Sequence, residues 1–533
     1  MSGEVKGGGA ERGMMRAAGL ISGLTLVSRV LGLVREQVFA ALLGAGMHAD
    51  AFQIAFRIPN LLRDLFAEGA LSAAFVPTYA AALARGGPEE AHRLARRLVS
   101  ALGVLLAILV TLGIAFAGPI VELLAPGYGG VAGKTELTVM LTRVMMPFLP
   151  LVSLAAVAMG MLNAQERFGA PALAPAMFNV VSVTWGFGLW LLGFDARAVV
   201  VGWAIGTLLG GLAQLVAQLP SLRRDGFRLG WDWAPRDPGL LRIAALMGPA
   251  TVGLAAVQIN IFISSRFASH EPGAVSWLMY AFRVLYLPIG IFGVALGTVA
   301  AVGLARSAAV DDGEGMRRTL RRALRMLLFL SVPATAGLWA LGVPVVRLLF
   351  ERGRFGAHDT EGTAAALAYY STGLVAYTGV KVLAPAFYAL GRPRVPLLGS
   401  ALAVATNLLV ILALQPRFGF RMVALGTALG SLLNAALLVL AFERRVGGLR
   451  RQGLLAGALR MSAAAGAMAA ACLLLARALE SAVGSQGLPA QLVTGLVPVV
   501  VGVVLYGVFS RLLGVPEVDA LLQLVRRRGS APA

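Results

Sequence analysis

The chain has 533 residues, of which 58% are hydrophobic and only 14% charged, and its mean hydropathy is +0.79. Soluble domains carry about 25% charged residues, so this composition excludes a soluble globular protein and indicates an integral membrane protein. The long runs of Ala, Leu, Val and Gly are typical of membrane helices and exclude the short alternating strands of an outer-membrane barrel.

The formal charge of +20 does not indicate a nucleic-acid partner. The basic residues fall in short clusters between apolar segments and not on one amphipathic face, so bilayer topology explains them better. The single cysteine, Cys472, has no intrachain disulfide partner. We interpret it as a small core or lipid-facing residue.

Apolar segments long enough to cross a bilayer recur along the whole chain, which predicts an all-α polytopic protein with about fourteen transmembrane helices. These segments are 20–43, 50–83, 98–124, 136–162, 171–193, 197–219, 240–267, 274–305, 323–350, 362–390, 395–414, 421–442, 454–479 and 489–513. The first is read as a retained helix because no small-residue cleavage site follows it.

Arginine and lysine concentrate in alternate connections, together with the N-terminus and the tail that ends in three arginines at 526–528. The positive-inside rule therefore predicts that both termini are cytoplasmic. The loop with Arg352 and Arg354 is the one basic exception on the outside. The tail fits an amphipathic stretch on anionic headgroups, or a solvated disordered end.

An internal repeat is visible in the sequence. Residues 55–57 (AFR) recur at 281–283, the Arg pair 96–97 recurs at 321–322, and Gly206-Thr207 recurs as Gly426-Thr427. The two copies contain six segments each, and an even number gives both the same orientation, so we predict a parallel repeat around a central cavity. The last two segments lie outside the duplication.

These observations predict six regions along the chain. They are a cytoplasmic N-terminus (1–19), an N-lobe of helices one to six (20–222), a cytoplasmic linker (223–239), a C-lobe of helices seven to twelve (240–446), helices thirteen and fourteen (447–513) and a basic cytoplasmic tail (514–533).

Charged side chains lie in or beside the apolar material of residues 20–78. Charge at membrane depth is costly and tends to face a wet cavity that serves function. We expect a cavity lined by arginines, with acidic residues as their partners when no substrate is bound. The cavity candidates are Arg29, Arg35, Arg63 and Arg283, with Arg57, Asn60 and Lys381 as additional candidates, and the acidic partners or gating residues are Asp50 and Glu68, with Glu36 and Asp64 nearby.

Guanidinium groups bind phosphate or carboxylate oxygens bidentately, so this set predicts a substrate with an anionic head. A second interpretation stays open for each arginine and for Lys381. In this interpretation the side chain extends from a helix end to the lipid headgroups (snorkelling). Gly44, Gly46, Pro59 and Gly69 are candidate hinges, although Gly and Pro are also common in membrane helices generally.

Signals for an enzyme or a metal site are weak. Residues 126–135 (PGYGGVAGKT) resemble a phosphate-binding Walker loop, but Tyr128 stands where the first glycine is required. The four histidines show no ligand or triad spacing, and the polar residues Gln258, Asn260, Asn407 and Asn434 have no accompanying carboxylate for a hard cation. We expect no catalysis, no metal and no cofactor, and the coupling ion stays open.

Several motifs resemble the MurJ (MviN) lipid II flippases of the multidrug/oligosaccharidyl-lipid/polysaccharide (MOP) exporter superfamily. They are 28–35 (SRVLGLVR), 44–46 (GAG), 50–52 (DAF), 58–63 (IPNLLR), 66–77 (FAEGALSAAFVP), 293–298 (GVALGT), 349–355 (LFERGRF) and 359–360 (DT). The resemblance covers essentially the whole chain, and the second-segment motif is the most specific.

The resemblance implies transport of the undecaprenyl-pyrophosphate-linked peptidoglycan precursor from the inner to the outer leaflet of the bacterial cytoplasmic membrane, for cell-wall biogenesis and cell shape. It matches the family's cavity arginines to Arg29, Arg35, Arg63 and Arg283, and its acidic residues to Asp50 and Glu68. It also implies that helices thirteen and fourteen form a groove for the lipid tail. Arg283 departs from the family pattern because its neighbours are Phe282 and Tyr286, where many members carry acidic residues.

Other functions fit parts of the pattern. Within transporters these are a flippase for another lipid-linked oligosaccharide and a drug or cation antiporter, which would favour carboxylates over arginines in its cavity. A polyprenyl-phosphate glycosyltransferase would need a carboxylate dyad or a large outer domain. A non-transporting scaffold for cell-wall enzymes would make the cavity charges dispensable. The expected partners are lipid II, membrane lipids and cell-wall synthesis proteins.

Overall fold

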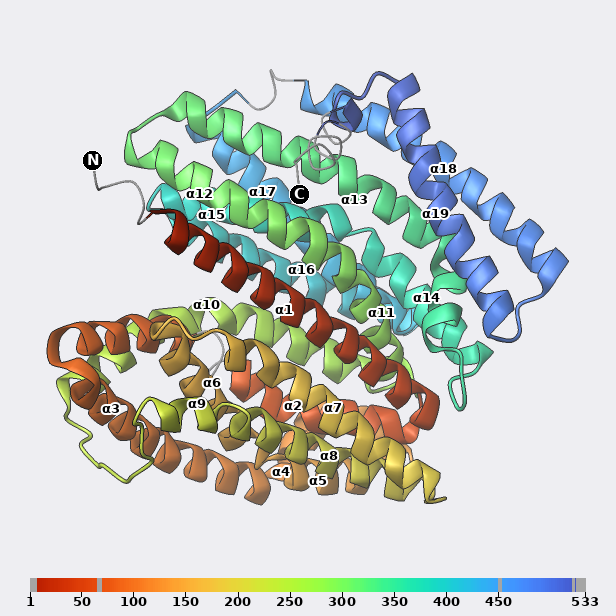
Figure 1. Ribbon diagram of the computed structural model, residues 1–533. Helices are drawn as coiled ribbons and strands as arrows, with labels where there is room; N and C mark the ends of the chain where they lie inside the picture. The colour runs from red at the N-terminus through yellow and green to blue at the C-terminus, as the bar shows by residue number, and fades with distance from the viewer. Residues whose placement is uncertain (1–6, 65–69, 449–452, 520–522, 524–533) are drawn as a thin grey trace. The chain divides into compact units, whose positions relative to one another are not determined.

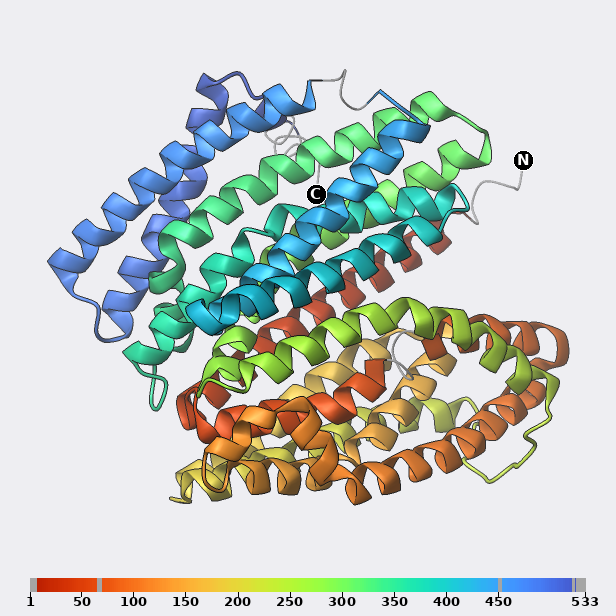
Figure 2. The same cartoon turned by 180° about the vertical axis from the view of Figure 1, so that it is seen from behind.

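The computed structural model describes residues 7–64, 70–448, 453–519 and 523, and every regular element in these ranges is a helix (Figures 1 and 2). Side chains are described from residue 23 onward, except residues 25, 70 and 249–254 within these ranges. The predicted all-α class is confirmed. A helix satisfies its backbone N–H and C=O groups internally, which lipid requires.

The first of two compact units comprises Met1–Gln258 and Arg352–Phe355. Its helices are α1 (Gly7–Leu43), α2 (Met47–Arg63), α3 (Ala70–Ala115), α4 (Ala117–Leu124), the 3₁₀ turn η2 (Pro126–Gly130), α5 (Lys134–Met145), α6 (Phe148–Ala164), α7 (Gly169–Leu191), α8 (Ala196–Val216), α9 (Leu219–Arg224) and the start of α10 (Pro238–Ala268).

The second unit comprises Ile259–Glu351 and Gly356–Ala533. After the end of α10 it contains α11 (Ala274–Pro288), the π-helical segment η3 (Ile289–Val294), α12 (Ala295–Ala309), α13 (Gly313–Phe350), α14 (Ala357–Ser371), α15 (Leu374–Ala389), α16 (Arg394–Phe418), α17 (Arg421–Arg445), α18 (Leu454–Val483) and α19 (Leu488–Leu512). The boundary between the units falls inside α10, after Gln258, and the linker that the sequence predicts at 223–239 lies within the first unit.

Ten helical segments of the described chain are long and apolar enough to cross a membrane. Each of them corresponds to one predicted span. The first of them, in α3, contains span three and also the second half of span two, because α3 is continuous across both. The other four predicted spans correspond to α1, α2 with the start of α3, α10, and the pair α14 and α15. The protein is therefore a multi-pass membrane protein.

Several spans that the sequence predicts as single segments are broken. Span 136–162 divides into α5 and α6 at Met146 and Pro147, because proline supplies no N–H to the helical ladder. Span 362–390 divides into α14 and α15 at Thr372 and Gly373. A Cβ on Gly373 would lie 2.8 Å from Cα of Ala428, so only glycine allows this close approach to α17.

The two units repeat one packing pattern, as the internal similarity predicts. In the first unit α2 packs on α5, α3 on α6, α6 on α8 and α7 on α8. In the second unit the corresponding pairs are α11 with α14, α12 with α15, α15 with α17 and α16 with α17. Helix distortions recur as well, at Phe116 (φ −98°, ψ 17°) and Leu341 (φ −113°, ψ 15°).

Glycines four residues apart bring the last two helices of each repeat together. A Cβ on Gly210 of α8 would lie 2.5 Å from Oγ of Ser182 on α7. A Cβ on Gly430 of α17 would collide with the carbonyl oxygen of Ala403 on α16. Gly206 and Gly426, one turn earlier, make the same kind of approach, which is the small-xxx-small packing of membrane helices.

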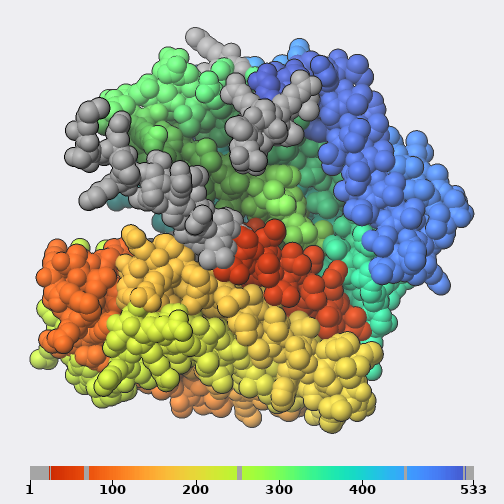
Figure 3. Space-filling view, in the orientation of Figure 1, coloured from red at the N-terminus to blue at the C-terminus, as the bar shows by residue number. Residues whose placement is uncertain are grey.

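The last two helices, α18 and α19, pack on each other and on α13, and they form the blue surface of the second unit in Figure 3. Their shared core with α13 contains Phe329, Met468 and Tyr506. Exposed apolar residues cover their other faces, with Leu474 67% and Val503 71% exposed. Such a surface is stable in hydrocarbon and costly in water.

Candidate functional site

The predicted arginines of the first unit lie along two helices. Arg29 and Arg35 are on α1, and Arg57 and Arg63 are on α2, with Asn60 between the last two. Arg29 is exposed, whereas Arg35, Arg57, Asn60 and Arg63 are half-buried. Glu68 lies outside the described residues.

Helix α7 holds the arginine-bearing part of α1. The Nδ2 of Asn179 donates to the carbonyl oxygen of Ser28 at 3.2 Å, next to Arg29. One residue earlier on α7, the Phe178 ring centroid lies 5.1 Å from the guanidinium carbon of Arg35. Nη2 of Arg35 also pairs with Oε1 of its neighbour Glu36 at 2.7 Å. Ring and carboxylate together orient the Arg35 guanidinium.

Arg63 ends α2 and pairs with the next residue. Its Nη2 and Nε donate to Oδ1 of Asp64 at 2.9 and 3.2 Å. The other carboxylate oxygen of Asp64 accepts a hydrogen bond from Nε2 of Gln258 at 3.5 Å. The Arg63 side chain is 23% exposed and that of Asp64 32%, so solvent weakens this pair and another anion can compete for the guanidinium.

Asp50 lies deeper, in a buried cluster at the start of α2. Its Oδ2 pairs with Nζ of Lys134, the first residue of α5, at 2.8 Å, and the two side chains are 0% and 2% exposed. The Tyr128 hydroxyl donates to the Asp50 carbonyl oxygen at 3.0 Å, and Nζ of Lys134 lies 4.1 Å from the Tyr128 ring centroid. We call Asp50, Lys134 and Tyr128 the first clamp.

Tyr128 belongs to the 3₁₀ turn η2, between the membrane helices. Burial raises the pKa of its phenol well above the ordinary value, and the carboxylate of Asp50 raises this pKa further, while Arg57 lowers it. The phenol is therefore protonated at neutral pH and acts as a hydrogen-bond donor. The Walker-like stretch of residues 126–135 comprises this turn, the following loop and the start of α5, and its buried tyrosine contacts α2 through Asp50.

The second unit has a related contact at the corresponding helix ends. Nε1 of Trp277, in the first turn of α11, donates to Oδ1 of Asp359, in the first turn of α14, at 3.1 Å. In the register that aligns Arg97 with Arg322, Lys134 aligns with Asp359. The acidic residue of the contact is thus Asp50 on α2 in the first repeat and Asp359 on α14 in the second. We call Trp277 and Asp359 the second clamp.

Arg283 and Lys381 are exposed residues of the second unit, on α11 and α15. Phe282 and Tyr286, which flank Arg283 on α11, are 37% and 51% exposed. The backbone of Lys381 packs closely against Gly297 of α12. A Cβ on Gly297 would lie 2.7 Å from the Lys381 carbonyl oxygen, so only glycine fits at this contact. The Lys381 side chain extends from this tightly packed position.

The structure thus joins Arg35 to Glu36, Arg63 to Asp64 and Asp50 to Lys134. Lys134, Tyr128 and Gln258 are partners in these contacts that the sequence does not predict. In the sequence, Lys134 and Tyr128 stand out only as parts of a Walker-like stretch, and Gln258 only as a polar residue without an accompanying carboxylate. Lys134 lies in the first turn of α5, and its partner Asp50 is 84 positions away in the chain. No local sequence pattern therefore predicts this pair.

Comparison with known proteins gives a consistent result. The family model described as "Lipid II flippase MurJ" matches residues 39–494. The "Probable lipid II flippase MurJ" of Vibrio cholerae serotype O1 is 36% identical over 433 residues, covering 80% of this chain and 82% of the relative. The "Lipid II flippase MurJ" of Burkholderia cenocepacia is 35% identical over 453 residues, covering 81% and 84%.

Solved structures show the same fold. The structure titled "Lipid II flippase MurJ, inward closed conformation" aligns with a TM-score of 0.74 at 24% identity, covering 93% of this chain and 99% of that one. An inward-facing multidrug resistance MATE transporter of the MOP superfamily aligns at 0.63 and 17% identity, covering 81% and 99%. The extent of the family match and the identities of these relatives show that the chain belongs to the lipid II flippase MurJ family.

Proposed function

We propose that this protein is a lipid II flippase, which moves the undecaprenyl-pyrophosphate-linked peptidoglycan precursor from the inner to the outer leaflet of the bacterial cytoplasmic membrane by alternating access. Both termini are cytoplasmic in this proposal. The observation that carries it is the row of arginines on α1 and α2 of a multi-pass protein that belongs to the lipid II flippase family.

The local ion pairs fit this role. Arg35 and Arg63 each pair with the acidic residue that follows in the sequence, and these side chains are 11–32% exposed. A diphosphate offers more acceptor oxygens than one carboxylate and can replace it without moving the helix. In this proposal Arg29, Arg35, Arg63 and Arg283 hold the pyrophosphate, and Glu36 and Asp64 occupy their neighbouring guanidinium groups when the substrate is absent.

The membrane potential contributes to the direction of transport. Moving negative charge outward is favourable when the inside is negative, by about 2.3 kcal/mol per charge per 100 mV. A diphosphate therefore gains free energy on leaving the cytoplasmic side. The polyprenyl tail stays in the bilayer, and the exposed apolar faces of α18 and α19 offer it a surface.

The clamps support a mechanism with rigid units. The first clamp joins α2 to α5 and the second joins α11 to α14, each at equivalent points of the repeat. Polar contacts between buried groups are costly to break, so these helix pairs move together. Proline 59 lies inside α2 between the first clamp and Arg63, where it removes one ladder hydrogen bond and permits bending.

The test is a depletion experiment in a bacterium whose own lipid II flippase is under inducible control. The chain is expressed during depletion, and lipid II is measured in each leaflet by its susceptibility to an externally added enzyme that cleaves it. We expect the chain to restore outer-leaflet lipid II and cell shape. If lipid II stays in the inner leaflet although the chain is folded and inserted, the proposal is wrong, and restored export of a different lipid-linked oligosaccharide would identify another substrate.

A further inference from the structure

We propose that an apolar groove between α3 and α10 binds one acyl chain of an anionic membrane phospholipid, whose headgroup rests on the arginines at the end of the groove. This α3–α10 groove lies entirely in the first unit and contains none of the residues assigned to lipid II. It is lined by Leu98, Leu102 and Leu105 of α3 and by Leu241, Ala244 and Met247 of α10, among others.

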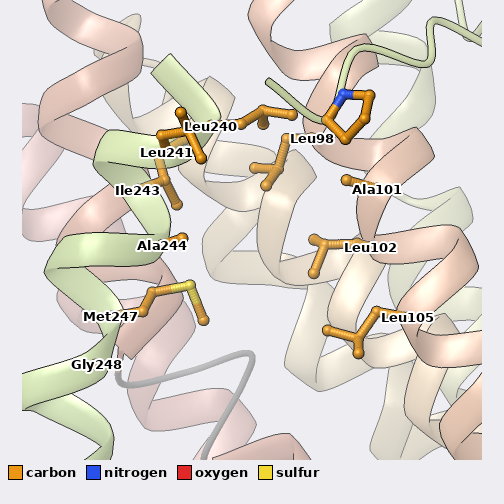
Figure 4. Close-up of a pocket in the computed structure, with 11 residues that line it drawn as sticks. Leu98, Ala101, Leu102, Leu105, Leu240, Leu241, Ile243, Ala244, Met247 and Gly248 are labelled. Carbon is orange, nitrogen blue, oxygen red and sulfur yellow. The ribbon is translucent and has the colours of Figure 1, made fainter. Parts of the chain in front are cut away.

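The groove has the character of a hydrocarbon site. Its volume is about 500 Å³, and Figure 4 shows the leucines of α3 and the side chains of α10 pointing toward one another across it. Four of the lining residues, Leu98, Leu102, Leu240 and Ile243, also belong to the buried core of the first unit. Leu105 and Leu241 are 40% and 56% exposed, so the groove is open at its surface. A water molecule needs polar partners, which this lining does not supply, whereas an acyl chain needs none.

The end of the groove carries an excess of positive charge. Residues 93–97 and 228–237 contain five arginines and two aspartates. Both aspartates pair with Arg97, since its Nε lies 3.3 Å from Oδ2 of Asp232 and its Nη1 contacts Asp237. Arg93, Arg228 and Arg236 are exposed, and Arg236 directly follows Pro235, which lines the groove. Exposed arginines at this position match an anionic headgroup.

A pair of tryptophans marks the same connection as an interfacial segment. Trp231 and Trp233 stack with ring centroids 6.1 Å apart and an interplanar angle of 10°. They are 70% and 50% exposed, and Leu229 is 74% exposed. In water this would be an unfavourable apolar surface, whereas tryptophan is enriched where headgroups meet acyl chains. The aromatic pair and two of the exposed arginines, Arg228 and Arg236, thus lie in the connection that leads directly into the groove lining on α10.

The test uses the full chain extracted from vesicles of palmitoyl-oleoyl-phosphatidylglycerol and palmitoyl-oleoyl-phosphatidylcholine, with retained lipid counted by native mass spectrometry. Ala244 is exposed, so Ala244→Trp fills the groove without disturbing the core. We expect this variant to retain phosphatidylglycerol about tenfold more weakly. Ala245→Trp, one residue along the same helix and outside the lining, is the matched control and should retain the lipid.

Two further measurements test the headgroup and the position. Arg236→Gln should reduce the preference for phosphatidylglycerol over phosphatidylcholine, whereas Arg394→Gln in the second unit should not. Phosphatidylglycerol brominated on its acyl chain should quench the fluorescence of Trp231 and Trp233. Their contribution is the difference in fluorescence between the parent chain and the variants with Phe at these positions. Equal retention by Ala244→Trp and the parent chain, equal retention of the two phospholipids, absence of quenching, or displacement of phosphatidylglycerol by a polyprenyl phosphate would each overturn the proposal.

Discussion

The carboxylate of Asp50 and the ammonium of Lys134 lie 2.8 Å apart with both side chains almost fully buried. Removing one member of a buried pair leaves an uncompensated charge, which costs about 3–5 kcal/mol. We therefore expect Asp50→Asn and Lys134→Met each to lower the thermal midpoint of the detergent-solubilised protein strongly, and the double variant to recover much of the loss. Glu314→Gln breaks the exposed 4.0 Å pair with Arg317 and should change little.

The contribution of Tyr128 can be separated into two parts. Tyr128→Phe removes the hydroxyl that donates to the Asp50 carbonyl but keeps a ring beneath Lys134, and should destabilise the protein by about 1 kcal/mol. Tyr128→Leu also removes the ring and should cost more. Denaturant unfolding in detergent measures both, with Tyr388→Phe at a 59% exposed tyrosine as control. Equal stability of the Phe and Leu variants would contradict the role given to the ring.

Much of the architecture can be predicted from the sequence because it depends on composition and repetition. Hydrophobic length fixes the spans, and the repeated AFR motif at 55–57 and 281–283 predicts the duplicated packing that the two units show. The breaks at Pro147 and Gly373 could not be predicted, because hydrophobic length gives one span across each of them, and proline and glycine are also common inside continuous membrane helices. The clamps could not be predicted either, since they join residues more than 80 positions apart.

The glycines between the paired helices provide a test of the repeat. Gly210→Ala places a methyl group against Ser182 and the Phe178 carbonyl, and Gly430→Ala places one against the Ala403 carbonyl. Because backbone atoms cannot move aside cheaply, each variant should lose about 1–3 kcal/mol of stability. Gly188→Ala, on α7 with nothing within 4 Å of the added Cβ, should be neutral or slightly stabilising. Neutral behaviour of all three variants would contradict the packing described here.

The pairing of Arg63 with Asp64 predicts opposite effects on substrate binding. Arg63→Gln removes charge-assisted hydrogen bonds worth about 1.5–3 kcal/mol and should weaken lipid II binding about tenfold or more. Asp64→Asn removes a competing anion and should leave binding unchanged or tighter, although Arg63 loses its 2.9 Å partner. Binding to the detergent-solubilised protein is the measurement. Equal weakening by both variants would show that the pair acts only in structure.

Leaflet-resolved export of lipid II by Arg29→Ala and Arg283→Ala variants tests whether arginines of both repeats hold the pyrophosphate, because these two arginines lie in different repeats. Each variant must first be shown to be folded and inserted, and Arg392→Ala, at an exposed arginine between α15 and α16, is the control. If Arg29 and Arg283 hold the pyrophosphate, lipid II will accumulate in the inner leaflet with both variants and not with the control. Export at the normal rate by folded, inserted Arg29→Ala and Arg283→Ala would contradict this role of the two arginines.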